Sequence, residues 1–200
     1  MFTIEKEVEY EEHIKKSHFI GNLLKCTTPE EAKTLINSIA SRYREATHNC
    51  WAYRTGLNGE LSHCSDAGEP SGTAGKPIMG AIHKHELSNV VLVVTRYFGG
   101  VKLGIRGLID AYRHIAEETI NKATLKEMIL KDYWEIKTDY AHADKIKHAI
   151  NELSAEIISA DYQEEVTIYA NTIANSGLKE FLQSNQDAGL LKYRLLKTEL

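Results

Sequence analysis

The chain has 200 residues, of which 42% are hydrophobic and 26% are charged, and its formal net charge at pH 7 is −4. This composition is that of an ordinary globular protein with one large domain or two small ones. The negative balance argues against a protein that binds duplex nucleic acid through bulk positive charge. All apolar runs are shorter than a membrane span and the acidic N-terminus lacks a signal pattern, so we expect a cytoplasmic protein without membrane contact.

The three cysteines, Cys26, Cys50 and Cys64, are odd in number and have no CxxC spacing. Such an arrangement predicts neither a disulfide framework nor a zinc knuckle. Cysteines in strands usually pack as small buried hydrophobes. We therefore expect no metal site and no cofactor.

The first third of the chain is typical of two strands, a helix and a hairpin. Residues 7–11 alternate charged and apolar side chains, and residues 18–26 form a second strand-like run. Residues 28–31, Thr-Pro-Glu-Glu, are typical of a helix start with a capping box. Residues 46–54 then favour a strand, and Asn-Gly at 58–59 predicts a hairpin turn.

The predicted hairpin gives a register. With Asn-Gly as its turn, Arg54 lies opposite His63 and, by extrapolation, His48 lies opposite Glu69. Strand alternation then places His48, Arg54 and His63 on one face. We therefore expect His48 to point toward the loop that follows the hairpin. A hydrogen-bonded structural histidine is the alternative.

Residues 65–77, Ser-Asp-Ala-Gly-Glu-Pro-Ser-Gly-Thr-Ala-Gly-Lys-Pro, form a Gly-rich loop. Apolar periodicity resumes directly after it, which predicts a helix with Pro77 in its first turn. Such an approach to a helix N-terminus is a natural anion site, because free N–H groups and the positive end of the dipole point the same way. The spacing fits neither a P-loop nor a nucleophile elbow, and a ligand-free connecting loop is the alternative. The predicted anion-binding residues in this loop are Gly72, Thr73, Gly75 and Lys76.

A second strand, Gly-rich loop and helix follow. Residues 89–96 form a continuous apolar, β-branched run that predicts a central strand, and the glycines of residues 97–107 do not have dinucleotide-binding spacing. Four basic residues between Arg96 and Arg113 favour anion contact over ordinary solvated charge. Four aromatic residues could stack on bases, Trp51, Tyr53, Tyr97 and Phe98, although aromatic residues in strands usually belong to a core. The further predicted anion-binding residues are Arg54, Arg96, Gly99, Gly100, Lys102 and Arg106.

A new series of strand and helix patterns begins near residue 126. The order of patterns there is βαββαβ, with strands expected at 128–138, 155–162, 164–171 and 189–196 and helices at 140–153 and 175–185. We therefore predict an N-terminal domain of residues 1–125 and a C-terminal domain of residues 126–200. The second domain holds nine Lys or Arg and thirteen Asp or Glu, so it carries the whole net charge. The sequence of this second domain contains no pattern of residues that indicates a catalytic site.

Three stretches in this order resemble the IMPACT/YigZ family: ATHNCWAYR at 46–54, SDAGEPSGTAGKP at 65–77 and VVTRYFGGVKLG at 93–104. The resemblance implies an α+β fold. Its N-terminal domain would be an α/β sandwich like domain 2 of a ribosomal small-subunit protein, and its C-terminal domain would be ferredoxin-like and similar to domains of translation elongation factors. It also implies a role in translation. Eukaryotic relatives compete for an activator of a starvation-responsive kinase, and bacterial members are suspected of binding RNA or the ribosome.

The chain departs from the family pattern at three positions. Ala67 stands where the family commonly has a second acid, which weakens any metal or acid–base hypothesis that needs paired carboxylates. Arg106 and Arg113 stand where the family has glycines, which strengthens the hypothesis of anion contact.

These observations favour a non-enzymatic, translation-associated regulator that binds RNA, the ribosome or a translation-control protein through its Gly-rich loops. The alternative is a small hydrolase or phosphotransferase with His48 as base and Asp66 or Glu69 orienting it or holding a metal. Ser71 is the remaining catalytic candidate. We expect His48, Glu69, Ser71 and Arg96 to converge on one surface.

Overall fold

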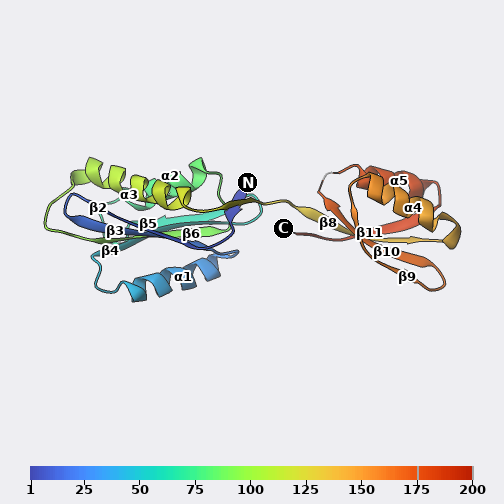
Figure 1. The fold of residues 1–200 in the computed structure, drawn as a ribbon, viewed down its shortest axis with the longest axis horizontal. Coiled ribbons are helices and arrows are strands. Elements are labelled where there is room, and N and C mark those ends of the chain that lie inside the picture. The colour runs from blue at the N-terminus through green and yellow to red at the C-terminus, as the bar shows by residue number, and fades with distance from the viewer. Residues whose placement is uncertain (175, 200) are drawn as a thin grey trace. The chain divides into compact units, whose positions relative to one another are not determined.

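The computed structural model describes residues 1–174 and 176–199. In this part of the chain the protein is a mixed α/β protein with five helices and three sheets (Figure 1). The chain divides into two compact units, Met1–Met128 (unit 1) and Ile129–Leu200 (unit 2). None of the described helices combines the length and the apolar character of a membrane span.

Unit 1 has three layers, with helices on both faces of a five-stranded antiparallel sheet (Figure 1). Its elements are β1 (Phe2–Ile4), β2 (Val8–Ile14), β3 (Ser17–Lys25), α1 (Pro29–Arg42), β4 (His48–Thr55), β5 (Leu61–Ser65), α2 (Gly75–Lys84), β6 (Val90–Tyr97), α3 (Gly104–Asn121) and β7 (Leu125–Glu127). The sheet order is β2-β3-β6-β4-β5, and β1 pairs separately with β7. α1 lies on one face, and α2 and α3 lie side by side on the other.

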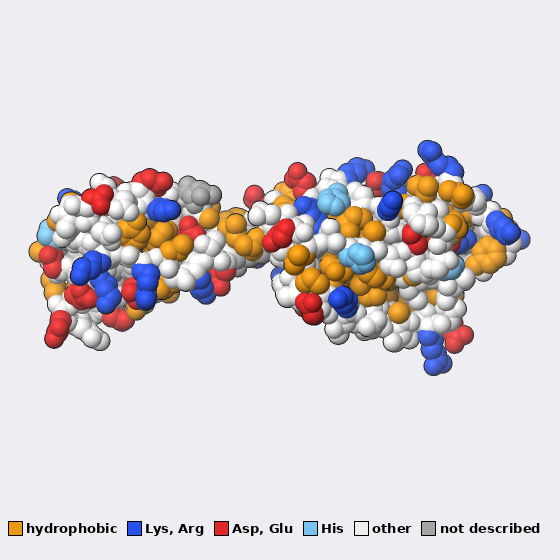
Figure 2. All heavy atoms as spheres, turned by 180° about the vertical axis from the view of Figure 1, so that it is seen from behind, with side chains coloured by type: hydrophobic (Ala, Val, Ile, Leu, Met, Phe, Trp, Pro, Cys, Tyr) orange, Lys and Arg blue, Asp and Glu red, His pale blue; other side chains and the backbone are white. Residues whose placement is uncertain are grey.

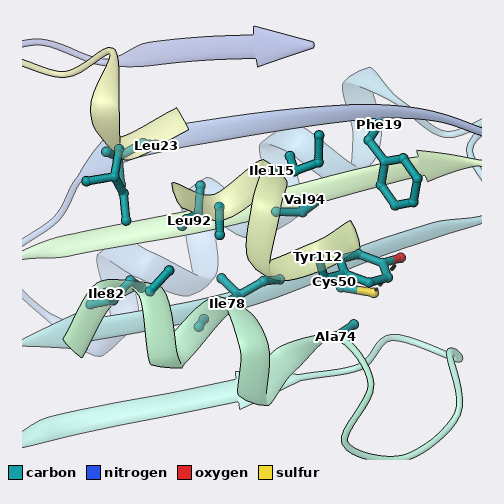
Figure 3. Packing of buried hydrophobic residues seen from close by; sticks show 14 of the residues in the cluster. Phe19, Leu23, Cys50, Ala74, Ile78, Ile82, Leu92, Val94, Tyr112 and Ile115 are labelled. Atoms are coloured by element: carbon teal, nitrogen blue, oxygen red, sulfur yellow. Dashed lines mark hydrogen bonds between the residues drawn. The ribbon is translucent and has the colours of Figure 1, made fainter. Parts of the chain in front are cut away.

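Strand β6 is the centre of the sheet because both of its faces are apolar. Leu92 and Val94 are fully buried on the face of α2 and α3, and Val91 and Val93 are fully buried on the face of α1. Figure 3 shows the first of these layers, in which α2 and α3 pack over the strand. Full burial of such a side chain contributes about 1.5–3 kcal/mol. The prediction of a central strand at 89–96 is confirmed.

The start of α1 also follows the prediction. Thr28 Oγ1 accepts a hydrogen bond from the Glu31 N–H at 3.2 Å, and the Glu31 carboxylate accepts one from the Thr27 N–H at 2.7 Å. These bonds satisfy backbone donors that have no partner within the helix. The capping box therefore fixes where the chain turns from β3 into α1.

The hairpin of β4 and β5 differs from the prediction by one residue. Arg54 pairs with Ser62, where the prediction had His63. The Gly59 N–H donates to the Gly56 carbonyl at 3.2 Å, so the tight turn is centred one residue earlier than predicted. A slip of one residue moves a side chain to the opposite face of the sheet. His63 therefore lies on the same face as α1, and the predicted register was wrong.

Unit 2 has the element order βαββαβ and a four-stranded antiparallel sheet. Its elements are β8 (Lys131–Thr138), α4 (Tyr140–Glu152), β9 (Glu156–Tyr162), β10 (Val166–Ile173), α5 (Leu178–Asp187) and β11 (Leu191–Glu199). The sheet order is β11-β8-β10-β9, and both helices lie on one face (Figure 1). Trp134 and Ile168 of the sheet pack there with Ile146 and Leu182 of the helices. The helix expected from residue 175 begins at Leu178, and residue 175 itself lies outside the described residues.

The two units divide slightly later than the expected boundary at residue 125. β7 pairs with β1 through Ile4 and Leu125, Thr3 and Lys126, and Phe2 and Glu127. This pairing holds residues 125–127 in unit 1, because it returns the chain to its own first strand. No pattern of alternating side chains in three residues would reveal such a short pair.

Candidate functional site

Strand pairing brings His48 and Arg96 together at one end of the sheet of unit 1. The two residues are direct partners in the β4–β6 ladder, and Glu69 reaches them from the loop after β5. Arg96 Nη1 lies 2.6 Å from Glu69 Oε1, and His48 Nε2 lies 3.9 Å from Glu69 Oε2. Three of the predicted candidates therefore meet around one carboxylate.

Ser17 and Tyr112 complete this group, which we call the polar cluster. The Nε and Nη2 atoms of Arg96 donate to Ser17 Oγ at 3.3 and 3.1 Å, and the Tyr112 hydroxyl donates to Glu69 Oε1 at 2.9 Å. Arg96 is only 5% exposed and Glu69 only 9%. Buried charges are tolerated when they are paired and hydrogen-bonded. The cluster is therefore, first of all, a structural connection between β3, β6, α3 and the loop after β5.

The ring of His48 has one defined orientation. Its Nδ1 atom lies 2.9 Å from the carbonyl oxygen of Ala67. A carbonyl oxygen can only accept, so Nδ1 carries the proton, and Nε2 is an acceptor in the neutral imidazole. Gly68, at φ +91°, allows this contact, because a Cβ there would lie 3.2 Å from Nδ1. The loop thus turns the free nitrogen of His48 toward Glu69.

The Gly-rich loop of residues 65–77 holds a carboxylate of its own. Asp66 Oδ2 accepts from the Gly72 N–H at 2.8 Å, and Oδ1 accepts from the N–H groups of Ala74 and Gly75, both at 2.9 Å. Burial acts to raise the pKa of the Asp66 carboxyl, but these three donors and the nearby Lys76 outweigh it and hold the pKa below its usual value. Asp66 therefore fills the anion position that the sequence predicted at the start of α2.

Cys50, beneath this loop, belongs to the same structural network. Its thiol donates to the Asp66 carbonyl at 2.9 Å and lies 3.3 Å from the Tyr112 hydroxyl. Burial raises the pKa of Cys50 to about 12, so the thiol stays protonated and is not a nucleophile. The described residues contain no group of three or more side chains that could hold a metal ion.

Sequence reasoning missed Ser17, Cys50 and Tyr112 as polar partners. Tyr112 lies on the apolar stripe of its helix and Cys50 on the inward face of its strand, so both look like core residues. Figure 3 shows them meeting inside the core. A hydroxyl or thiol in an otherwise apolar stripe was the only available signal, and it does not identify the partner.

A pocket of about 330 Å³ opens beside the polar cluster at the start of α3. Its lining consists of Glu69 and Arg96 together with Pro70, Phe98, Lys102, Leu103, Gly104, Ile105 and Leu108. The Phe98 side chain is 44% exposed, and the centre of its ring lies 5.3 Å from the Arg96 guanidinium carbon. Apolar walls with a few convergent polar groups are typical of ligand sites.

Exposed basic side chains occur in the lining of this pocket and on the segments next to it. Lys102 belongs to its lining, and Arg106, whose side chain is 86% exposed, lies in the first turn of α3 and pairs with Asp110 at 3.3 Å. The turn that carries Lys15 and Lys16 adjoins the second Gly-rich loop, because a Cβ on Gly99 would lie only 1.5 Å from the Lys16 carbonyl oxygen. Figure 2 shows Lys and Arg side chains next to exposed hydrophobic ones on unit 1.

The start of α3 differs from the start of α2. Among the described residues, no side chain caps α3, and its first turn contains no acid. The backbone N–H groups of Gly104 and Ile105 therefore keep their capacity to donate, beside Lys102.

Arg54 does not join the polar cluster. It lies at the opposite end of β4 from His48, and its guanidinium donates to the carbonyls of Asn58, Gly59 and Leu87 at 3.1–3.2 Å. These bonds use three of the five N–H groups of the guanidinium and hold the hairpin turn.

The other predicted residues of the first Gly-rich loop make no described hydrogen bond or ion pair with the cluster. Ser71 is exposed and makes no described side-chain hydrogen bond, and the Thr73 hydroxyl donates to the Pro70 carbonyl at 2.7 Å. Lys76 is exposed. In the second loop, Gly100 takes φ +83°, a conformation that favours glycine.

Two larger hollows, of about 710 and 680 Å³, lie on unit 2. Both are lined by Glu164 and Glu165, with Asp161 in the first and Asp139 in the second, against Lys137 in both and Lys192 in the second. They lack the buried ion pair of the unit 1 pocket, and their acidic lining does not suit a negatively charged ligand.

The fold and the site define a mixed α/β protein in which a buried polar cluster lies beside an exposed, basic, Gly-rich loop. The family model described as Impact N-terminal domain matches residues 15–120. This range includes the whole polar cluster and both Gly-rich loops. The chain therefore belongs to the IMPACT family.

Similar proteins agree with this assignment. IMPACT family member YvyE of Bacillus subtilis (strain 168) is 39% identical over 165 residues, which cover 82% of this chain and 76% of that protein. IMPACT family member YigZ of Escherichia coli (strain K12) is 31% identical and covers 78% of each chain. A solved structure, described as the crystal structure of an hypothetical protein, matches with a TM-score of 0.66 at 28% identity and covers 98% of this chain and 97% of that one. The resemblance found in the sequence is confirmed.

Proposed function

We propose that this IMPACT family protein is a non-enzymatic, translation-associated regulator that binds RNA, free or within the ribosome, at the second Gly-rich loop and the start of α3. One observation carries the proposal: exposed basic and aromatic side chains lie in the lining of the pocket of unit 1 and on the segments next to it. We call this group the basic rim. Phe98 and Lys102 belong to the lining, Arg106 lies in the first turn of α3, and Lys15 and Lys16 lie in the turn that adjoins the second Gly-rich loop.

The chemistry of the basic rim suits a single strand of RNA. Lys and Arg side chains contact phosphate oxygens, and an exposed aromatic ring can stack on a base. The buried pair of Glu69 and Arg96 is neutral as a whole, so it does not cancel the charge of the rim. A few local contacts suffice, and the net negative charge of the chain resides in residues 126–200.

The architecture supports the same proposal. We propose that unit 1 is an α/β sandwich of the kind found in domain 2 of a ribosomal small-subunit protein. Unit 2, with its βαββαβ order and sheet order β11-β8-β10-β9, would be a ferredoxin-like domain similar to those of elongation factors. Both kinds of domain work at the ribosome, which also favours a cytoplasmic location.

The hydrolase or phosphotransferase hypothesis has less support. Such an enzyme needs a base together with a nucleophile or a metal in one place. His48 Nε2 is free to act as a base, but the Asp66 carboxylate is engaged by three backbone N–H groups. Burial favours the protonated thiol of Cys50, and Ser71 makes no described side-chain hydrogen bond to a base.

Fluorescence anisotropy with a labelled single-stranded RNA at several salt concentrations tests the proposal. Lys102→Ala should weaken binding and flatten the dependence of log K on log salt by about 0.7, the value for one phosphate contact on a single strand. Lys33→Ala removes an exposed lysine of α1, on the other face of the sheet, and should change neither quantity. If Lys102→Ala leaves affinity and slope unchanged, RNA is not the ligand of the rim, and a translation-control protein becomes the better hypothesis.

A further inference from the structure

We propose that the outer face of α2 is a second contact surface for RNA, at which a phosphate lies against the helix backbone at Gly80, between Lys76 and Lys84. The inference rests on the proposed RNA-binding function and extends the contact from the start of α3 to the neighbouring helix. Two independent observations carry it: a glycine that the fold does not require, and the charge of the residues on the same face of α2.

Gly80 lies in the middle of α2 and is exposed. Its φ is not positive, and a Cβ at this position would meet no heavy atom within 4 Å beyond its chain neighbours and its own helix backbone. Every other described glycine either takes a positive φ or would bring its Cβ within 4 Å of another group. Glycine is also a poor residue for a helix interior. Neither backbone conformation nor packing within the chain therefore requires a glycine here.

The missing side chain leaves the helix backbone accessible from outside. Ile78 and Ile82 of α2 are fully buried, and both point into the core (Figure 3). Gly80 lies two positions from each of them, which places it on the opposite side of the helix. Glycine is typical of positions where the backbone closely approaches a ligand. The outer face of α2 thus has an open position at its centre.

The charged residues of α2 are all basic. Lys76 and Lys84 lie four residues before and four residues after Gly80, and residues with this spacing share one face of a helix. His83 is exposed beside them, and the sequence of α2 contains no Asp or Glu. Lys84 pairs with Glu117 of α3 at 3.0 Å, but its side chain is 63% exposed and an ammonium group has three donors. This face therefore complements a negatively charged ligand.

A phosphate of RNA fits this face. Its oxygens can accept hydrogen bonds from lysines on either side, and no side chain at Gly80 prevents it from approaching the helix. α2 lies beside α3 on the same face of the sheet (Figure 1), and the first turn of α3 carries Arg106 of the basic rim. One strand of RNA that contacts the rim can therefore continue onto α2.

Gly80→Leu tests the inference through two quantities that should change in opposite directions. Leucine favours a helix more than glycine does, so the melting temperature should rise by about 2–4 °C. The new side chain would keep a phosphate away from the backbone, so the affinity for a labelled oligouridine, measured by fluorescence anisotropy, should fall about tenfold. Ser38→Leu adds the same side chain at an exposed position of α1, on the other face of the sheet, and should leave the affinity unchanged.

The double variant Lys76→Ala/Lys84→Ala tests the charges of the same face. It removes two phosphate contacts and should flatten the dependence of log K on log salt by about 1.4, twice the value for one contact on a single strand.

Three results would overturn the inference. A fall in the melting temperature of Gly80→Leu would show that the fold itself requires Gly80. If Gly80→Leu and the double variant bind oligouridine as the wild type does while Lys102→Ala weakens binding, α2 is not a contact surface, but the proposed RNA binding stands. Absence of binding by the wild-type protein overturns both.

Discussion

The two Gly-rich loops of unit 1 each lead into a helix on the same face of the sheet, yet they present opposite surfaces. The loop of residues 65–77 turns its N–H groups inward onto the Asp66 carboxylate, and Asp66 completes the start of α2. The loop after β6 leaves the start of α3 without a side-chain cap, and the exposed basic residues Lys102 and Arg106 lie just before and just inside that start. The first loop is a closed structural element, whereas the second is open to a ligand.

The difference teaches that a Gly-rich approach to a helix predicts an anion at the helix start but not the source of that anion. An acid that precedes the loop, here Asp66, can supply it from within the chain. No acid occurs between Arg96 and Arg106 in the second loop. The presence or absence of a local carboxylate therefore separates a structural loop from a binding loop.

The largest effect should come from breaking the ion pair that connects the two loops. Arg96→Met leaves Glu69 buried without its cation, and such a change costs about 3–5 kcal/mol of the free energy of unfolding. The measurement is urea denaturation. The double variant Arg96→Met/Glu69→Gln removes both charges and should recover a large part of the loss. If the double variant is no more stable than the single one, the pair is not what connects the loops.

The closed loop should be sensitive to loss of its carboxylate. Asp66→Ala leaves three backbone N–H groups without their acceptor and should lower the free energy of unfolding by about 2–3 kcal/mol. Hydrogen exchange should show the loss concentrated at Gly72, Ala74 and Gly75. An increase in RNA affinity of the variant would instead show that the vacated site at α2 can take a phosphate.

The same carboxylate predicts a pH dependence. The pKa of Asp66 is lowered on folding, so its contribution to stability is fully present above the usual Asp pKa of about 3.9 and is lost as the pH falls through the lowered folded value. The difference in melting temperature between the wild type and Asp66→Asn should therefore be constant at neutral pH and shrink below about pH 4. A difference that grows on acidification would contradict this assignment.

Much of the fold follows from local patterns, whereas the site depends on contacts that patterns do not contain. The strand around Leu92 and the capping box at Thr28 could be predicted from the sequence, because side-chain periodicity and cap chemistry are local. The hairpin register was not, since a Gly56–Gly59 turn and an Asn-Gly turn look alike in sequence but differ by one residue in pairing.

The candidate site was partly predictable for the same reason. The hairpin register and the two strand–loop–helix units suggested that His48, Glu69, Ser71 and Arg96 converge, although that register was wrong by one residue. They could not show that Asp66 would satisfy its own loop or that Tyr112 would donate to Glu69, because both contacts are set by three-dimensional packing. The arginines Arg54 and Arg106 looked equivalent as anion contacts, although one is bound to backbone carbonyls and the other is exposed.

Substitutions of these two arginines should have the smallest effects, and they test the comparison of the closed and the open loop most selectively. Arg54→Ala removes three bonds to backbone carbonyls, so it should lower the free energy of unfolding by about 1–2 kcal/mol and leave RNA affinity unchanged. Arg106→Ala lies on the open loop. It should change stability by less than about 0.5 kcal/mol, since its partner Asp110 is also exposed, yet flatten the salt dependence of RNA binding by about 0.7. Denaturation and anisotropy on the same two preparations measure all four quantities.

If Arg54→Ala weakens RNA binding without loss of stability, the hairpin end of the sheet also binds RNA. The contrast between a closed and an open loop would then not describe where this protein contacts its ligand.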